Sequence, residues 1–219
     1  MRTIADLRTS KRCFALFGSG HSVPAIPKRE LYAIKQSCFT VFTNYAFCSF
    51  DSRVMDMLLF GDYHVGQWVW QHRDRNVLLW TREQAFQNGE PSEFHDLIDF
   101  WLEDAPGTFT LLWGLWNLRK HHPDKPVLLF GVDMHTDDAE NVKWYDKVIP
   151  DDKDRRIDPY PAKRSFARFT RDFAMYVKPE GVYNCNPDSG LGVYPRVYWR
   201  EVVSITTPTK GRGGIARKP

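Results

Sequence analysis

Small and polar residues follow an apolar run near the N-terminus, where their spacing could serve an anionic ligand. The run Phe14-Ala-Leu-Phe breaks into five loop residues, Gly18, Ser19, Gly20, His21 and Ser22. A strand that enters such a loop presents backbone N–H groups to an anion, and a following helix adds the positive end of its dipole. This pattern is typical of the start of a nucleotide site, although Gly-x-Gly also closes tight turns that bind nothing.

Ligand-type side chains also follow other apolar segments. Asn44 comes after a β-branched and aromatic run, Gly131-Val132-Asp133 ends a continuous apolar run, and Asn184 and Ser189 lie beside a further one. Each has a structural alternative, because Asn44, Asn184 and Ser189 could form turns and Asp133 could cap a helix. Their shared position at strand ends favours one site, since the carboxyl ends of parallel strands meet at one edge of a sheet.

The loop sequence narrows the class of ligand. The loop has no Lys-Ser/Thr pair, which argues against a triphosphate-binding P-loop. Val23 and Pro24 stand where a dinucleotide fingerprint would place its third glycine. Metal-ligand spacing is absent from the sequence. A mononucleotide, held by its sugar and phosphate, is the remaining candidate.

Proton transfer at this site would need a group close to the ligand. His135 follows the Gly-Val-Asp turn, two residues after Asp133, and Tyr145 lies in a long polar segment, residues 134–163. A histidine at the ligand edge of a sheet can act as a base or a phosphate partner. His135 and His21 could equally be surface residues, and Tyr145 could anchor the polar segment to the core.

The elements that must position these residues alternate between strand and helix patterns. Strands are expected at residues 12–17, 38–43, 65–71, 77–81, 125–133 and 181–186. Helices are expected at residues 27–36, 51–60, 91–103, 109–121 and 164–177. This order predicts a Rossmann-like α/β fold, an open and mostly parallel sheet with helices on both faces. Residues 134–163 are too long for a simple connection and are expected to form a lid insertion after the Gly-Val-Asp strand.

Length and composition set the broad class. The 219 residues fit one domain, expected at residues 1–203, followed by a flexible basic tail at residues 204–219. The net charge of +3 argues against a nucleic-acid-binding surface, with contact through the tail as the alternative. No signal peptide or membrane-crossing window is evident, so we expect a cytoplasmic protein. The four cysteines form no Cys-x-x-Cys pair and are expected to be buried free thiols, at positions Cys13, Cys38, Cys48 and Cys185.

The glycine loop, Asn44 and the Gly131-Val132-Asp133 motif follow one another along the chain. In this order of motifs the chain resembles the small Rossmann-like glycosyltransferases typified by bacterial CMP-sialic-acid-dependent sialyltransferases. Motility-accessory glycosyltransferases and archaeal-type hydroxymethylpterin diphosphokinases look like more distant relatives. The resemblance covers roughly residues 12–192, and a Pro-x-Ser turn of the family is similar to Pro187-Asp188-Ser189. It implies that the donor nucleotide lies among matching positions, here Gly18, Gly20, Ser22, Asn44, Gly131 and Asp133.

Two motifs differ from that family. Pro106-Gly107-Thr108 replaces a Ser-Gly or Thr-Ser-Gly motif, so Gly107 and Thr108 are the corresponding contact candidates. The family's histidine base late in the lid is missing, because this lid has Asp158-Pro-Tyr-Pro161. The resemblance implies a nucleotide-sugar donor, such as a CMP-sugar, an unknown acceptor and no tightly bound cofactor, with His135 or Tyr145 as the proton-transfer group. The alternatives are pyrophosphate transfer to a small heterocycle, and a non-catalytic phage-type morphogenetic or accessory protein that keeps the fold.

Overall fold

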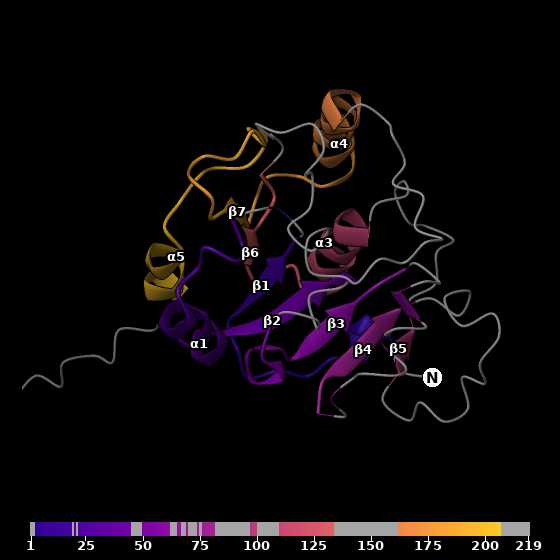
Figure 1. The fold of residues 1–219 in the computed structure, drawn as a ribbon, viewed down its shortest axis with the longest axis vertical. Helices are drawn as coiled ribbons and strands as arrows, with labels where there is room; N and C mark the ends of the chain where they lie inside the picture. Colours follow the sequence, from indigo (N-terminus) through magenta and orange to yellow (C-terminus); the bar gives the residue numbers. More distant parts are fainter. Residues whose placement is uncertain are drawn as a thin grey trace, which may run out of the picture.

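The fold is an open α/β sheet, seen here in a computed structural model (Figure 1). Seven strands, all paired in parallel, follow the order β5-β4-β3-β2-β1-β6-β7. The structure describes residues 3–18, 20, 22–44, 50–61, 65–66, 69, 74, 76–81, 97–99, 110–133 and 162–206, and their side chains except at 97–99, 162–167 and 206.

The strands and helices have the following bounds. The strands are β1 Cys13–Phe17, β2 Cys38–Thr43, β3 Met57–Leu59, β4 Leu78–Thr81, β5 Leu97–Asp99, β6 Val127–Phe130 and β7 Val182–Asn184. The helices are α1 Lys28–Ser37, α3 Thr110–His121, α4 Ala162–Tyr176 and α5 Trp199–Thr206, with short 3-10 turns at Ile4–Asp6 and Ser52–Val54.

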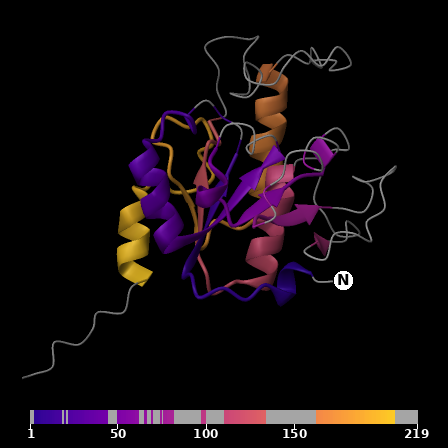
Figure 2. The same ribbon diagram turned by 60° about the horizontal axis from the view of Figure 1, so that its bottom comes forward.

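Helices cover both faces of the sheet (Figure 2). Every residue of β1 and β2 is buried, which explains why these strands read as unbroken apolar runs rather than alternating ones. On one face α1 and α5 pack through a cluster that includes Leu31, Ile34 and Trp199. On the other face α3 and α4 contribute Leu115 and Phe173 to a second cluster. The Rossmann-like arrangement expected from the sequence is confirmed.

The strand order places a topological switch point at the centre of the sheet. From β1 the chain adds β2, β3, β4 and β5 on one side and then crosses to add β6 and β7 on the other. At such a point neighbouring loops leave the carboxyl edge in opposite directions, which opens the crevice where ligands bind in α/β folds. The loops after β1 and β6 are those that carry Gly18 and Asp133.

Three expected elements are wrong. Residues 51–60 form no continuous helix, because Asp51 caps only the Ser52–Val54 turn and Met57–Leu59 then pairs with β2 inside the sheet. The expected helix at 91–103 contains the strand Leu97–Asp99, which pairs with β4. The described residues of 65–71 are helical rather than extended. In each case a short apolar run fitted either period. For Met57–Leu59 and Leu97–Asp99, pairing with a neighbouring strand decided the outcome.

Some expectations fall outside the described residues. Most of the expected lid lies outside them, and its last two residues belong to α4. The expected tail begins inside α5, which ends at Thr206.

The cysteines were expected to be buried free thiols. Cys13 and Cys38 are buried free thiols and Cys185 is a half-buried one, whereas Cys48 is not described. Among the described residues, no helix has both the length and the apolar character needed to span a bilayer.

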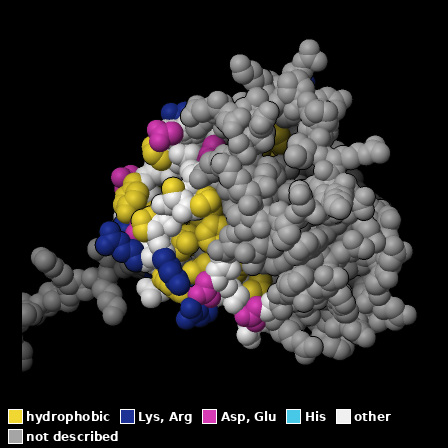
Figure 3. All heavy atoms as spheres, in the orientation of Figure 1, with side chains coloured by type: hydrophobic (Ala, Val, Ile, Leu, Met, Phe, Trp, Pro, Cys, Tyr) yellow, Lys and Arg dark blue, Asp and Glu magenta, His cyan; other side chains and the backbone are white. Residues whose placement is uncertain are grey.

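Helix α5 is fastened to α1 by one carboxylate. Glu30 Oε1 accepts hydrogen bonds from Trp199 Nε1 at 2.6 Å and from Tyr198 Oη at 2.9 Å, and Oε2 accepts one from Arg200 Nη2 at 2.8 Å. Burial opposes ionisation of this group, but the bonds from Arg200, Trp199 and Tyr198 outweigh burial and lower the pKa of Glu30. Around α1 and α5, Figure 3 shows Lys and Arg side chains interspersed with Asp and Glu.

Replacing this carboxylate should weaken the attachment of α5. We expect Glu30→Gln to lower the free energy of unfolding by about 1–2 kcal/mol at neutral pH, because part of the charged hydrogen bonding is lost. Since the folded pKa is depressed, this contribution is complete above the unfolded pKa and is lost as the pH falls through the folded one. Urea unfolding between pH 3 and pH 7 measures it. Glu201→Gln, on the exposed side of α5, is the control, and equal effects of both variants would contradict this account.

Candidate functional site

The carboxyl ends of β1 and β6 are held together by their backbones. Gly18 N–H donates to Phe130 O and Gly20 N–H donates to Gly131 O, both at 2.8 Å. A Cβ atom at Gly18 would lie 2.6 Å from Gly131 O, so a side chain there would separate the two strand ends. Gly131 itself has φ of 65°, in the left-handed region that favours glycine. The close approach of the two loops therefore explains these glycines.

Asp133 fastens the glycine loop from the other side. Its Oδ2 accepts a hydrogen bond from Ser22 N–H at 2.9 Å, and its Oδ1 accepts from Ser22 Oγ at 2.5 Å and from Asn186 Nδ2 at 2.6 Å. The residue is only 7% exposed. Three donors of this kind offset the cost of burying a carboxylate. We call Ser22, Asp133 and Asn186 the Asp133 clasp, because together they join the ends of β1, β6 and β7.

The clasp also accounts for Gly20. A Cβ atom at this position would lie 2.5 Å from Asp133 Oδ2 and 2.6 Å from Gly131 O. Any side chain would therefore push the loop away from the carboxylate. The glycine spacing that suggested a ligand loop is required by the packing of the loop against β6.

The turn after β7 uses its polar residues internally. Ser189 Oγ donates to Val132 O and accepts from Leu191 N–H at 3.0 Å, while Gly190 N–H donates to Asp133 O at 2.6 Å. Asn184 Oδ1 accepts from Asn186 N–H at 3.1 Å. Asn184 and Ser189 thus have the turn-forming roles that were the alternative to ligand contact. Asn186 was missed in the sequence, although the Asn-x-Asn repeat after β7 could have indicated it.

Within the described part of the loop, no backbone amide is left for an anion. The N–H groups of Gly18, Gly20, Ser22 and Val23 donate to Phe130 O, Gly131 O, Asp133 Oδ2 and Gly20 O, respectively. The expected phosphate cradle is therefore not supported at these positions. The remaining predicted site residues lie outside the described ones, namely Ser19, His21, Gly107, Thr108, His135 and Tyr145.

Asn44 differs from the residues of the clasp. It follows β2, whose last residue is bonded to β1 through Thr43 Oγ1 donating to Phe17 O at 2.9 Å. Its φ is 55°, a left-handed conformation that asparagine adopts more readily than most residues with a side chain and that also fits the turn-forming alternative. Its Oδ1 is buried and has no hydrogen-bond partner among the residues that the structure describes. A buried acceptor that lacks a partner, in the residue that follows β2 at the carboxyl edge, makes Asn44 a candidate for ligand contact.

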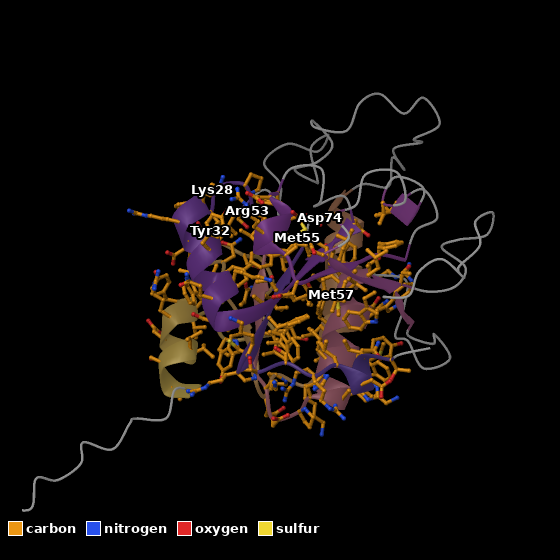
Figure 4. The ribbon with its side chains drawn as sticks, turned by 90° about the horizontal axis from the view of Figure 1, so that it is seen from below. Lys28, Tyr32, Arg53, Met55, Met57 and Asp74 are labelled. Carbon is orange, nitrogen blue, oxygen red and sulfur yellow. The ribbon has the colours of Figure 1, made fainter. Side chains whose placement is uncertain are left out.

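A second polar cluster lies beside α1 and, unlike the clasp, consists of charged side chains around Asp51 (Figure 4). Asp51 accepts hydrogen bonds from Arg53 Nε at 2.9 Å and from Tyr32 Oη at 3.1 Å, and Lys28 Nζ lies 3.9 Å from the same carboxylate. The bonds from Arg53 hold the pKa of Asp51 well below its usual range. Because both cations face Asp51, this cluster is a local ion network. Among the described residues, no group of His, Cys, Asp and Glu side chains could hold a metal ion.

Comparisons with known proteins add no relative, because no family model, curated protein or solved structure matches the chain.

The clasp should contribute measurably to stability. We expect Asp133→Asn to lower the free energy of unfolding by about 1–3 kcal/mol, because an amide NH₂ group would replace one of the two accepting oxygens. Even in its better orientation it would face the Ser22 N–H donor and leave that buried group unpaired. Urea unfolding measures the change. Asp188→Asn, on the exposed tip of the same region, is the matched control and should have little effect. An Asp133→Asn protein as stable as the wild type would contradict the role assigned to the clasp.

Proposed function

We propose that the protein is glycosyltransferase-like and binds a nucleotide-sugar donor at the carboxyl edge of the sheet, beside the β1/β6 switch point. The observation that carries the proposal is Asn44, with its left-handed backbone and its buried, unpartnered Oδ1. The Rossmann-like sheet and the resemblance of the glycine loop and the Gly131-Val132-Asp133 motif to small glycosyltransferases support it.

The chemistry of Asn44 indicates what it would bind. An amide oxygen only accepts hydrogen bonds, so the missing partner is a donor such as a ribose hydroxyl or the exocyclic amine of a base. Leaving a buried acceptor unpaired costs about 1–3 kcal/mol, and a bound donor would recover that cost. Every ribonucleotide carries ribose hydroxyls, and those of cytosine, adenine and guanine also carry an exocyclic amine. In this proposal Asn44 orients the nucleoside and the Asp133 clasp keeps the neighbouring loop in place.

The proposed reaction is transfer of the sugar to an acceptor hydroxyl. The acceptor oxygen attacks the anomeric carbon, the bond from that carbon to the nucleotide phosphate breaks, and a base removes the hydroxyl proton. His135 and Tyr145 are the proposed candidates for that base. Because His135 lies only two residues after Asp133, the clasp would hold the start of the segment that leads to it.

A second candidate function is a non-catalytic module that keeps the fold. One observation favours this module: the polar groups of the first loop and of β6 are paired with each other, so they serve the structure without a ligand. These groups belong to Gly18, Gly20, Ser22 and Asp133. Such a module would show no sugar transfer or donor hydrolysis. A turnover assay with any donor that binds separates the two functions.

Binding can be tested by thermal shift with CMP, CDP, UDP, GDP, ATP and CMP-sialic acid. A ligand at a hundredfold excess over its Kd stabilises the native state by about 2.7 kcal/mol, which should raise the Tm by about 5 °C or more. If no nucleotide raises the Tm, the proposed function is wrong.

The same assay tests the role of Asn44. We expect Asn44→Gly to keep or raise the Tm without ligand, because glycine accepts the positive φ and the unpaired oxygen is removed. The nucleotide affinity should fall roughly tenfold through the lost hydrogen bond. Asn76→Gly, before β4 at the opposite edge of the sheet, is the control. Unchanged affinity in Asn44→Gly would contradict the assignment.

A further inference from the structure

A second buried oxygen without a partner lies further along the same edge. Thr81, the last residue of β4, is 0% exposed, and its Oγ1 has no hydrogen-bond partner in the part of the chain that the structure describes. Buried hydroxyls are normally paired, so this one needs a reason. No motif drew attention to Thr81 in the sequence, because a threonine at the end of a strand is common.

The register of the sheet relates Thr81 to Asn44. Thr43 of β2 pairs with Leu59 of β3, and Leu59 pairs with Trp80 of β4. The next residues of β2 and β4, Asn44 and Thr81, therefore stand at the same level of the carboxyl edge, two strands apart. Neighbouring strands are about 4.8 Å apart, so the two positions are separated by about 10 Å across the sheet.

This separation restricts what could satisfy both oxygens. One sugar or base ring is too small to reach from β2 to β4, whereas a nucleotide joined to a sugar is long enough. The two groups also differ in chemistry, since the Asn44 oxygen accepts only and a threonine hydroxyl both donates and accepts. A hydroxyl of that kind suits the hydroxyl groups of a sugar.

We propose that Thr81 contacts the sugar of the donor, so that the nucleotide-sugar lies along the carboxyl edge from the β1/β6 switch point to β4. This inference rests on the proposed function and adds the direction of the ligand and the residue that recognises its sugar. An internal water bound to Thr81 is the alternative, and it predicts no effect of this residue on affinity.

Thr81→Val, which replaces the hydroxyl with a methyl group of similar size, tests the inference. Without ligand we expect an equal or higher Tm, because an unpaired hydroxyl is removed from a buried position. Calorimetry with CMP and UDP should give wild-type Kd values, because these probes lack the sugar. The Kd for CMP-sialic acid, or for UDP-glucose if the protein binds uridine nucleotides, should rise roughly tenfold.

Thr40→Val is the matched control. Its Oγ1 donates to Val54 O at 2.7 Å, so this variant should lose stability and keep the wild-type affinity for both kinds of probe. If Thr81→Val binds the nucleotide-sugar as tightly as the wild type does, the inference is overturned and the proposed function stands. If the wild type binds none of these probes and none of the nucleotides in the thermal-shift panel, both are overturned.

Discussion

The buried carboxylate of Asp133 holds the centre of this protein together. β1 leads to one side of the sheet and β6 to the other, so their loops diverge and need a link at the carboxyl edge. Asp133 supplies that link through Ser22 and extends it to β7 through Asn186. The glycines of the first loop follow from this contact, because a Cβ atom at Gly20 would collide with the carboxylate.

Polar groups at the carboxyl edge therefore fall into two kinds. The groups of the Asp133 clasp are satisfied by each other and define the shape of the edge. Asn44 Oδ1, just after β2, and Thr81 Oγ1, at the end of β4, are buried without partners among the described residues, and the clasp joins neither strand. The first kind stabilises the loops without a ligand, whereas the second costs stability until a ligand supplies the missing partner. For this reason the proposed function depends more on Asn44 than on the glycine loop.

Long apolar runs made much of the fold predictable from the sequence. β1, β2 and β6 are buried on both faces, so their residues are mostly apolar and form runs that are easy to recognise. Met57–Leu59 and Leu97–Asp99 were missed, because three residues cannot reveal a period and their strand state depends on neighbours already in the sheet. At the site, the sequence indicated Asn44 and Asp133. It could not indicate that Asn186 would bond to Asp133, since 53 positions separate them.

The most direct test of the account is the side-chain amide signal of Asn44 in a two-dimensional ¹H–¹⁵N NMR spectrum, assigned by its loss in Asn44→Gly. During titration with CMP, or with whichever nucleotide raises the Tm, this signal should shift progressively and saturate as the amide oxygen gains a hydrogen-bond partner. The side-chain amide of Asn76, at the opposite edge, should stay in place. A nucleotide that binds and shifts other signals while leaving that of Asn44 unmoved would contradict the central claim.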